Sequence, residues 1–233
     1  MKRIFLLLLA VATVAPLFAQ NDHFAFNFFE RMQELDNQNV LISPLSIKQA
    51  IGLAANSAQN ETLSEILSLS DDESLGALNL RNQQESSVAI RHQYDTLSGV
   101  KMANSVWYKP EMITLSDAYR DSLINRYAAE IREADFGTQA GVDSLNAWVS
   151  RQTNGLIPKL MESPDAYKLL SLVNAVYFKG TWWDEMFPAG NQAFRNADGS
   201  GTNVEMMQYG KADDNLYYQK DFIAFKKDFV SAD

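Results

Sequence analysis

The chain has 233 residues, of which 46% are hydrophobic, and its formal net charge at pH 7 is −9. An acidic chain without a basic stripe is a poor match for nucleic acid or for an anionic membrane surface, so we expect neither as a partner. The sequence contains no cysteine, which excludes both disulfides and a thiol nucleophile.

Residues 1–19 have the layout of a secretory signal peptide. Two basic residues are followed by an apolar segment at 4–14, and Ala19 is a small residue at a suitable cleavage point. The alternative is a membrane anchor, but an apolar segment of this length is too short to span a bilayer. We therefore expect residues 20–233 to be the mature, soluble protein, located in the extracellular space or the periplasm.

The mature chain begins with helical signals. Residues 24–35 carry apolar side chains at helical spacing, which predicts an amphipathic helix. Residues 40–42 are typical of a short buried strand. Ser43 is then a good N-cap, with Pro44 at the first helical position, where the missing N–H of proline is not needed. The predicted apolar stripe of that helix consists of Ile47, Ile51 and Ala54 or Ala55.

Two further helix starts follow. The sequence from Thr62 to Glu65 has the form of a capping box and predicts a helix through Leu69. Asn60-Glu-Thr62 is also a glycosylation sequon, although a turn with a helix cap is the better interpretation. The acidic run at 71–73 suits the N-terminus of another helix.

Strands and helices then alternate without an internal repeat or a linker, which indicates an α+β fold. The predicted elements are strands at 100–108 and near 130–136, a helix at 116–130, and an amphipathic helix that carries Val142, Leu145, Trp148 and Val149 and ends at Asn154-Gly155. Beyond residue 182, Phe187, Phe194 and residues 204–207 indicate more strands, separated by turns such as 198–201.

The stretch at 169–182 is a run of β-branched and aromatic residues that is too apolar for a surface strand, so it predicts a strand in the middle of a covered sheet. Asn174 lies at its centre. A buried primary amide costs a few kcal/mol unless its donors and its acceptor find partners. We therefore expect a polar cluster around Asn174, at a place where the sheet has to open.

The parts of an enzyme are missing. His23 and His92 are the only histidines, and no Gly-x-Ser-x-Gly motif presents a serine. Residues 196–207 superficially resemble a calcium loop, but Met207 stands where a bidentate glutamate is needed. We predict no catalytic residues, no metal and no cofactor.

Five ordered motifs resemble one family, the serpins. They lie at residues 39–47, 57–62, 146–157, 172–187 and 206–207. The most specific is Leu-Val-Asn-Ala-Val-Tyr-Phe-Lys-Gly-Thr-Trp at 172–182, followed by Phe187. Ser57 and Asn60 replace two family glycines, and Asn60 still tolerates the left-handed backbone that the turn needs. The resemblance covers about residues 24–218.

The resemblance implies a fold in which helices pack on a large central mixed or antiparallel sheet. It also implies a suicide inhibitor: a serine or cysteine protease cleaves an exposed reactive loop, which then inserts into the sheet as a new strand. In family terms Ser43, Ser46 and Asn174 form the "shutter" and Trp182 belongs to the "breach". The simpler interpretation makes Ser43 a helix cap and Trp182 a core residue. Other motif positions are Asn39, Pro44, Thr62, Asn146, Trp148, Thr153, Gly155, Tyr177, Phe178, Gly180 and Phe187.

The resemblance ends before residues 219–233, which replace the rest of the family pattern, including the reactive loop. We expect a truncated or frameshifted sequence, with a genuinely short product as the alternative, and in both cases a chain that is inactive by itself. A second functional hypothesis is a non-inhibitory serpin fold that serves as a carrier or binding module. Residues 70–99 lack a cluster of Lys and Arg, so we expect no heparin-like site.

Overall fold

The computed structural model describes residues 22–35, 40–70, 72–91, 98–196, 198–209, 216–220, 223–225 and 227–230. The predicted signal peptide at 1–19 and the motif residue Asn39 lie outside these ranges. No helix in the described part of the chain combines the length and the apolar character needed to cross a membrane.

The described residues fall into two compact units. The first comprises those up to Arg91 together with Lys101–Tyr177, and the second comprises those within 92–100 together with Phe178–Asp233.

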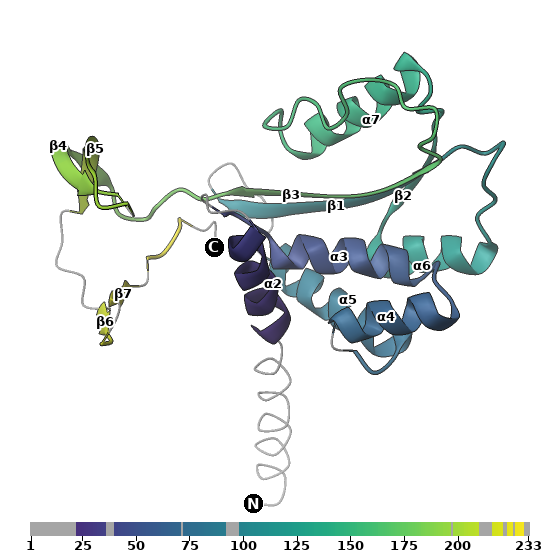
Figure 1. Ribbon diagram of the computed structural model, residues 1–233, viewed down its shortest axis with the longest axis horizontal. Coiled ribbons are helices and arrows are strands. Elements are labelled where there is room, and N and C mark those ends of the chain that lie inside the picture. The colour runs from purple at the N-terminus through teal and green to yellow at the C-terminus, as the bar shows by residue number, and fades with distance from the viewer. Residues whose placement is uncertain are drawn as a thin grey trace, which may run out of the picture. The chain divides into compact units, whose positions relative to one another are not determined.

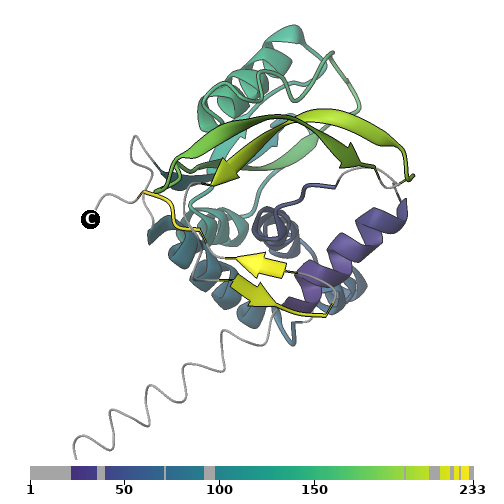
Figure 2. The ribbon, with the colours of Figure 1, turned by 90° about the vertical axis from the view of Figure 1, so that its left-hand side faces the viewer.

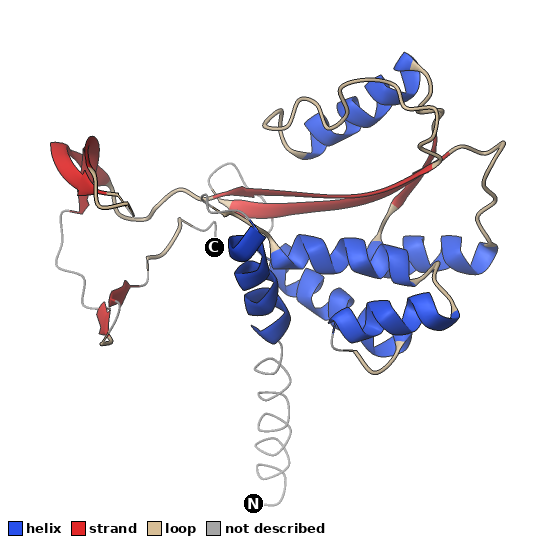
Figure 3. Cartoon of the chain, viewed as in Figure 1, coloured by secondary structure: helices blue, strands red, loops and turns tan. Residues whose placement is uncertain are grey.

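The helices are α2 (Asp22–Leu35), α3 (Pro44–Ala55), α4 (Asn60–Ser70), α5 (Leu75–Arg91), α6 (Asp117–Tyr127) and α7 (Gln139–Gln152). The strands are β1 (Gly99–Tyr108), β2 (Glu130–Glu133), β3 (Leu170–Lys179), β4 (Met186–Arg195), β5 (Gly201–Tyr209), β6 (Leu216–Tyr218) and β7 (Ile223–Phe225). Figure 3 distinguishes the helices from the strands, and all of these helices precede β3 in the sequence.

A mixed sheet with the strand order β2-β1-β3 forms the centre of the first unit. β1 and β2 are parallel. β1 and β3 run antiparallel, because Lys109 bonds Leu169 at one end of the pair while Asn104 faces Asn174 further along. Helix α7 covers one face of this sheet, and α3 and α6 cover the other (Figure 1). The observed architecture is the α+β arrangement that the sequence predicted, with helices packed on a mixed sheet.

Two hydrophobic clusters fill the first unit. On the α3 and α6 side, Leu53, Val106 and Leu123 are fully buried. On the α7 side, Trp107, Phe136 and Trp148 form the centre, with the two indole rings edge to face at 6.4 Å. Each cluster takes residues from β1, so this strand is covered on both faces.

The second unit consists of β-ribbons. β4 and β5 pair antiparallel, with a bulge between Pro188 and Gly190, and form a long curved ribbon (Figure 2). The predicted turn between them is present, with Gly199 at φ 84°. β6 and β7 form a short antiparallel pair.

Three local predictions require correction. Residues 40–42 are not a strand: they have no regular structure and Leu41 is 98% exposed, because high β-propensity without a neighbouring strand does not order a segment. Thr62 is not a cap, since α4 already begins at Asn60, whose φ is 51°. The acidic run is not the start of α5 either, because Ser74 supplies the cap by accepting the N–H of Ala77 at 3.2 Å.

Two burial predictions also change. Ile47 and Ile51 are only half-buried, and the buried face of α3 consists of Lys48, Gln49, Gly52, Leu53 and Ala55. The strand at 169–182 lies at the edge of the described sheet rather than in its middle, and Val173 and Ala175 are its buried positions.

Candidate functional site

The N-terminus of α3 positions the first side chain of the candidate site. Ser43 has extended backbone angles and its hydroxyl accepts the N–H of Ser46 at 3.3 Å, with Pro44 at the first helical position, so the predicted N-cap is confirmed. Because Ser43 is used in this way, the side chain that reaches the sheet comes from Ser46, one turn into the helix.

A chain of hydrogen bonds then joins helix α3 to two strands. The Ser46 hydroxyl donates to Asn174 Oδ1 on β3, and Asn174 Nδ2 donates to Asn104 Oδ1 on β1 at 2.7 Å. Asn104 Nδ2 in turn donates to the carbonyl oxygen of Tyr127, the last residue of α6, at 2.8 Å. We call Ser46, Asn174, Asn104 and the Tyr127 carbonyl group the latch. It ties β1 and β3 to each other and to the helices that cover them.

The latch continues into a buried polar network between α3, α5 and α6. Gln49 Nε2 donates to the carbonyl of Asn82 at 3.1 Å, and Asn82 Nδ2 donates to the carbonyl of Lys48 at 3.0 Å. The Tyr127 hydroxyl donates to Asn79 Oδ1 at 2.6 Å. Burial raises the pKa of Tyr127, and its hydrogen bonds with neighbouring amides only partly offset this, so the phenol stays protonated and remains a donor.

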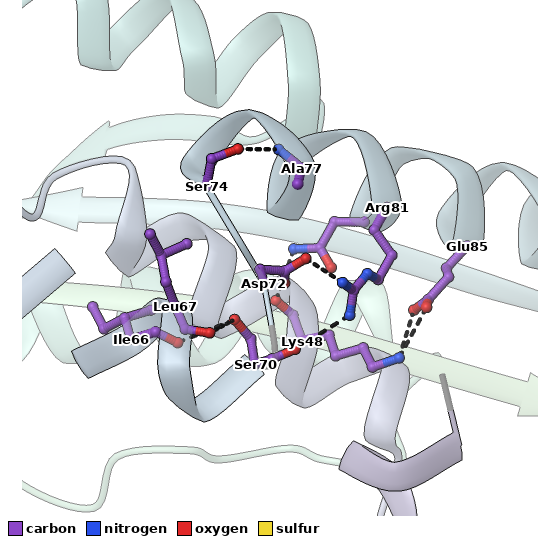
Figure 4. A network of polar contacts seen from close by, with 10 residues as sticks. Lys48, Ile66, Leu67, Ser70, Asp72, Ser74, Ala77, Arg81 and Glu85 are labelled. Atoms are coloured by element: carbon purple, nitrogen blue, oxygen red, sulfur yellow. Dashed lines mark hydrogen bonds and ion pairs between the residues drawn. The ribbon is translucent and has the colours of Figure 1, made fainter. Parts of the chain in front are cut away.

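Ion pairs hold α5 against its neighbours (Figure 4). Lys48 Nζ lies 2.8 Å from Glu85 Oε1, and it also lies over the ring of Phe24 at 5.7 Å. Arg81 pairs with Asp72, whose side chain is fully buried, and Arg81 donates to the carbonyl of Ser70 at 3.2 Å. Partly buried pairs of this kind are costly to break, because the charge left behind has no partner. They therefore fix the position of the helix that carries Asn79 and Asn82.

Sequence reasoning did not identify Asn104, Gln49 or Asn82 as part of the site. The signal that singled out Asn174, an amide within a strongly apolar strand, is also present at Asn104, which is 6% exposed. Gln49 and Asn82 are 2% and 1% exposed and lie on helices, where a polar residue normally indicates the solvent face.

Trp182 belongs to the second unit. It stacks on Phe229 with 4.3 Å between ring centroids, and Phe178 meets the same ring edge-on at 5.3 Å. Gly180 permits this packing, because a Cβ there would lie 2.3 Å from the Phe229 ring. Trp182 is nevertheless 42% exposed, so it is not a core residue of this unit.

The motif residues of α7 fix the loop that follows the helix. Asn146 Oδ1 accepts the N–H groups of Leu160 and Met161 at 2.8 and 2.9 Å, and its Nδ2 donates back to the carbonyl of Met161. Thr153 is 2% exposed and bonds Val149 and Ile157. Gly155 has φ 81°, the left-handed conformation predicted for the end of this helix.

The remaining motif residues have structural positions. Trp148 is buried and its indole N–H donates to Glu130 at 2.8 Å. Tyr177 and Phe178 lie on β3 and Phe187 on β4, and Phe178 and Phe187 are about half exposed. Among the residues that the structure describes, no group of His, Cys, Asp or Glu is arranged to hold a metal ion.

Comparison with known proteins identifies the family. The family model "Serpin (serine protease inhibitor)" matches residues 19–226. Serpin-Z2A of Oryza sativa subsp. japonica is 32% identical over 87% of this chain and 50% of its own length, and Iripin-8 of Ixodes ricinus is 33% identical over 70% and 41%. The chain therefore spans about half the length of the curated relatives that it matches.

Solved structures agree. A loop C-sheet serpin polymer is 31% identical, with a TM-score of 0.69 over 83% of this chain and 51% of that structure. The native state of tengpin, a thermophilic serpin, is 30% identical, with a TM-score of 0.69 over 84% and 50%. The chain belongs to the serpin family.

Proposed function

We propose that the protein acts as an inhibitor of serine-type proteases, including related cysteine proteases, by cleavage of a reactive loop and insertion of that loop into the central sheet. In this proposal the described chain contributes the sheet β2-β1-β3 and the latch that holds it in place. The observation that carries the proposal is the row of hydrogen bonds from Ser46 through Asn174 to Asn104.

The latch suits a sheet that must stay closed and then open once. Of the two amides in the latch, Asn104 is buried and Asn174 is partly buried. Such an amide stabilises a single arrangement when it is hydrogen-bonded, and a buried one that loses its partners costs about 1–3 kcal/mol. Asn174 bonds a helix on one side and a strand on the other. Any movement of β3 away from β1 therefore breaks directional bonds, which have to be remade in the expanded sheet.

We further propose that the protein works outside the cytoplasm after removal of residues 1–19, and that it is not an enzyme. The support is the basic start, the apolar segment and the small residue at position 19 in the sequence, together with the absence of cysteine and of a serine elbow. An inhibitor of secreted proteases needs only to present a loop and a sheet, without a catalytic group of its own.

Incubation with target proteases tests the inhibitory function. The product of the longest reading frame that contains this sequence would be mixed with trypsin, chymotrypsin and elastase and separated by SDS gel electrophoresis. We expect an SDS-stable band of protease and inhibitor together with loss of protease activity. Cleavage without trapping for all three enzymes, and for a papain-like protease, would favour the carrier function instead.

The chain of 233 residues by itself provides the second half of this test. Since it corresponds to about half of its relatives, we expect it to form no SDS-stable complex with any of these proteases. A stable band from this chain would show that the trapping element lies within residues 20–233 and would overturn the division of roles proposed above.

A further inference from the structure

A pocket of about 270 Å³ opens between α3, α5, α6 and β1, entirely within the first unit. Its lining combines Gln49, serines of α5, Met102 to Asn104 on β1, and the C-terminal end of α6 at 125–128. The volume is below the roughly 300–1,000 Å³ typical of sites for drug-sized ligands, so an occupant has to be small.

Gln49, a lining residue of the pocket, has a side-chain oxygen that is only weakly hydrogen-bonded. Gln49 Oε1 receives Asn104 Nδ2 at 3.5 Å, which is the outer limit for a hydrogen bond, while the same Nδ2 is held by Tyr127 O at 2.8 Å. Both amides are more than nine-tenths buried. A ligand that offers this oxygen a closer donor therefore binds with a favourable hydrogen-bond contribution.

The outer wall is also rich in acceptors. The hydroxyl groups of Ser86 and Ser87 donate to Asn82 O at 2.6 Å and to Gln84 O at 2.8 Å. Because their protons are used in these bonds, the two hydroxyl oxygens can serve a ligand as acceptors. The last turn of a helix leaves carbonyl groups without intrahelical partners, and residues 125–127 of this wall lie in such a turn. The carbonyl group of Tyr127 already accepts Asn104 Nδ2, so its second lone pair is the one open to a ligand. A ligand for this wall has to supply several donors.

Charge narrows the class of ligand further. The negative end of the α6 dipole disfavours an anion. Among the lining residues that the structure describes, Arg126 is the one that carries a charge, and its positive charge disfavours a cation. Met102 and Ala103 offer apolar contact to carbon atoms. We propose that this pocket binds a small uncharged polyol, no larger than a monosaccharide, whose hydroxyl groups donate to Gln49 Oε1 and to the serine oxygens.

Ligand-observed NMR on the full chain tests the proposal, with xylitol as the probe. We expect saturable binding with a Kd of roughly 1–10 mM, as befits so small a ligand. The matched ligand 1,5-pentanediol has the same carbon chain but fewer donors, and it should bind about tenfold more weakly. Direct binding is the required measurement, because polyols at high concentration stabilise most proteins by exclusion from the surface.

Variants locate the site. Gln49→Met keeps the shape of the side chain and removes the acceptor, so we expect about tenfold weaker xylitol binding. If that buried change prevents folding, the exposed Ser87→Ala replaces it, with roughly threefold weaker binding expected. Ser64→Ala, an exposed serine of α4 outside the pocket, is the control and should bind as the parent does. Unsaturable binding, equal binding of the two ligands, or equal affinity of the Ser87 and Ser64 variants would overturn the proposal.

Discussion

The two compact units bury their large side chains to very different extents. In the first unit Trp107, Trp148 and Leu53 are at most 2% exposed, and they pack on both faces of one strand. In the second unit Trp183 and Tyr217 are 68% and 69% exposed, although they belong to segments just as rich in aromatic residues.

The difference follows from the architecture. A strand covered by helices buries side chains on both of its faces, as β1 does at residues 104–108. A two-stranded ribbon by itself is only marginally stable. The first unit therefore has a hydrophobic core of its own. In the part of the second unit that the structure describes, backbone pairing of the ribbons and the small stack of Trp182 on Phe229 contribute to stability.

The largest expected effect comes from removing a tryptophan ring, which can be done in both units and so compares a buried site with an exposed one. Trp148→Ala removes a buried ring that packs against Trp107, and it should lower the free energy of unfolding by about 3–5 kcal/mol. Trp183→Ala removes an exposed ring and should change it by less than about 0.5 kcal/mol. Urea titrations followed by circular dichroism measure both, and equal losses would refute the contrast.

The latch is the next test. Asn174→Ala leaves the Ser46 hydroxyl and Asn104 Oδ1 without their partner, so we expect a loss of about 1–3 kcal/mol in the free energy of unfolding together with more polymer. Asn191→Ala, on the exposed face of β4, is the control. Thermal melting and size-exclusion chromatography provide the measurements. A melting temperature and a monomer content that match the parent would rule out a closing role for Asn174.

A smaller effect is expected in the second unit. Gly180→Ala places a methyl group against the Phe229 ring, which should turn the ring away from Trp182, while Gly201→Ala meets open space. Ring stacking of this kind is worth about 0.5–1.5 kcal/mol. Hydrogen exchange of the Trp183 and Val230 amides, which pair with this segment, should accelerate only in the Gly180 variant. Unchanged exchange would show that the stack does not hold residues 181–183 and 228–230 together.

The smallest effect concerns pH. Burial works against ionisation of Glu130, but hydrogen bonds from Trp148 and Arg132 outweigh it, so its pKa lies below the ordinary value of 4.5. A carboxyl group whose pKa is lowered by folding contributes stability at any pH above its pKa in the unfolded chain. That contribution is lost as the pH falls through the lower pKa of the folded state. The Glu130 side chain is 41% exposed, so solvent screening keeps the effect small.

Melting curves between pH 6 and pH 3 test this prediction. Glu130→Gln retains an acceptor for the Trp148 N–H but cannot titrate, so its loss of melting temperature on acidification should be smaller than that of the parent. Parallel curves for the two proteins would show that Glu130 does not contribute to acid sensitivity.

Local chemistry explains which elements could be predicted. Ser43 and Ser116 mark the starts of α3 and α6 because each hydroxyl accepts an N–H of the first turn. Asn154-Gly155 marks the end of α7 because both residues tolerate the positive φ that they adopt there. The segment 40–42 failed because a strand exists only where another strand pairs with it, and sequence pattern alone does not reveal that partner.

The site was predictable only in part, for a related reason. Asn174 stood out as an amide within an apolar strand, whereas Ser46 came from the family resemblance. An amide in such a strand predicts that a partner exists without saying which residue it is. Asn104 faces Asn174 because of the β1–β3 register, in which Lys109 pairs with Leu169. A shift of the register by one residue would turn Asn104 to the opposite face.

The latch also bears on the order in which the chain folds. The bond between Ser46 and Asn174 joins residues 128 positions apart, and that between Asn104 and Asn174 joins residues 70 apart. Contacts that close such long loops form after local helices and nearby strands, since the loop entropy has to be offset first. Interactions that form after the rate-limiting step slow unfolding and leave the folding rate almost unchanged. The latch should therefore mainly slow the opening and unfolding of the sheet, and it should have little influence on the rate at which the sheet folds.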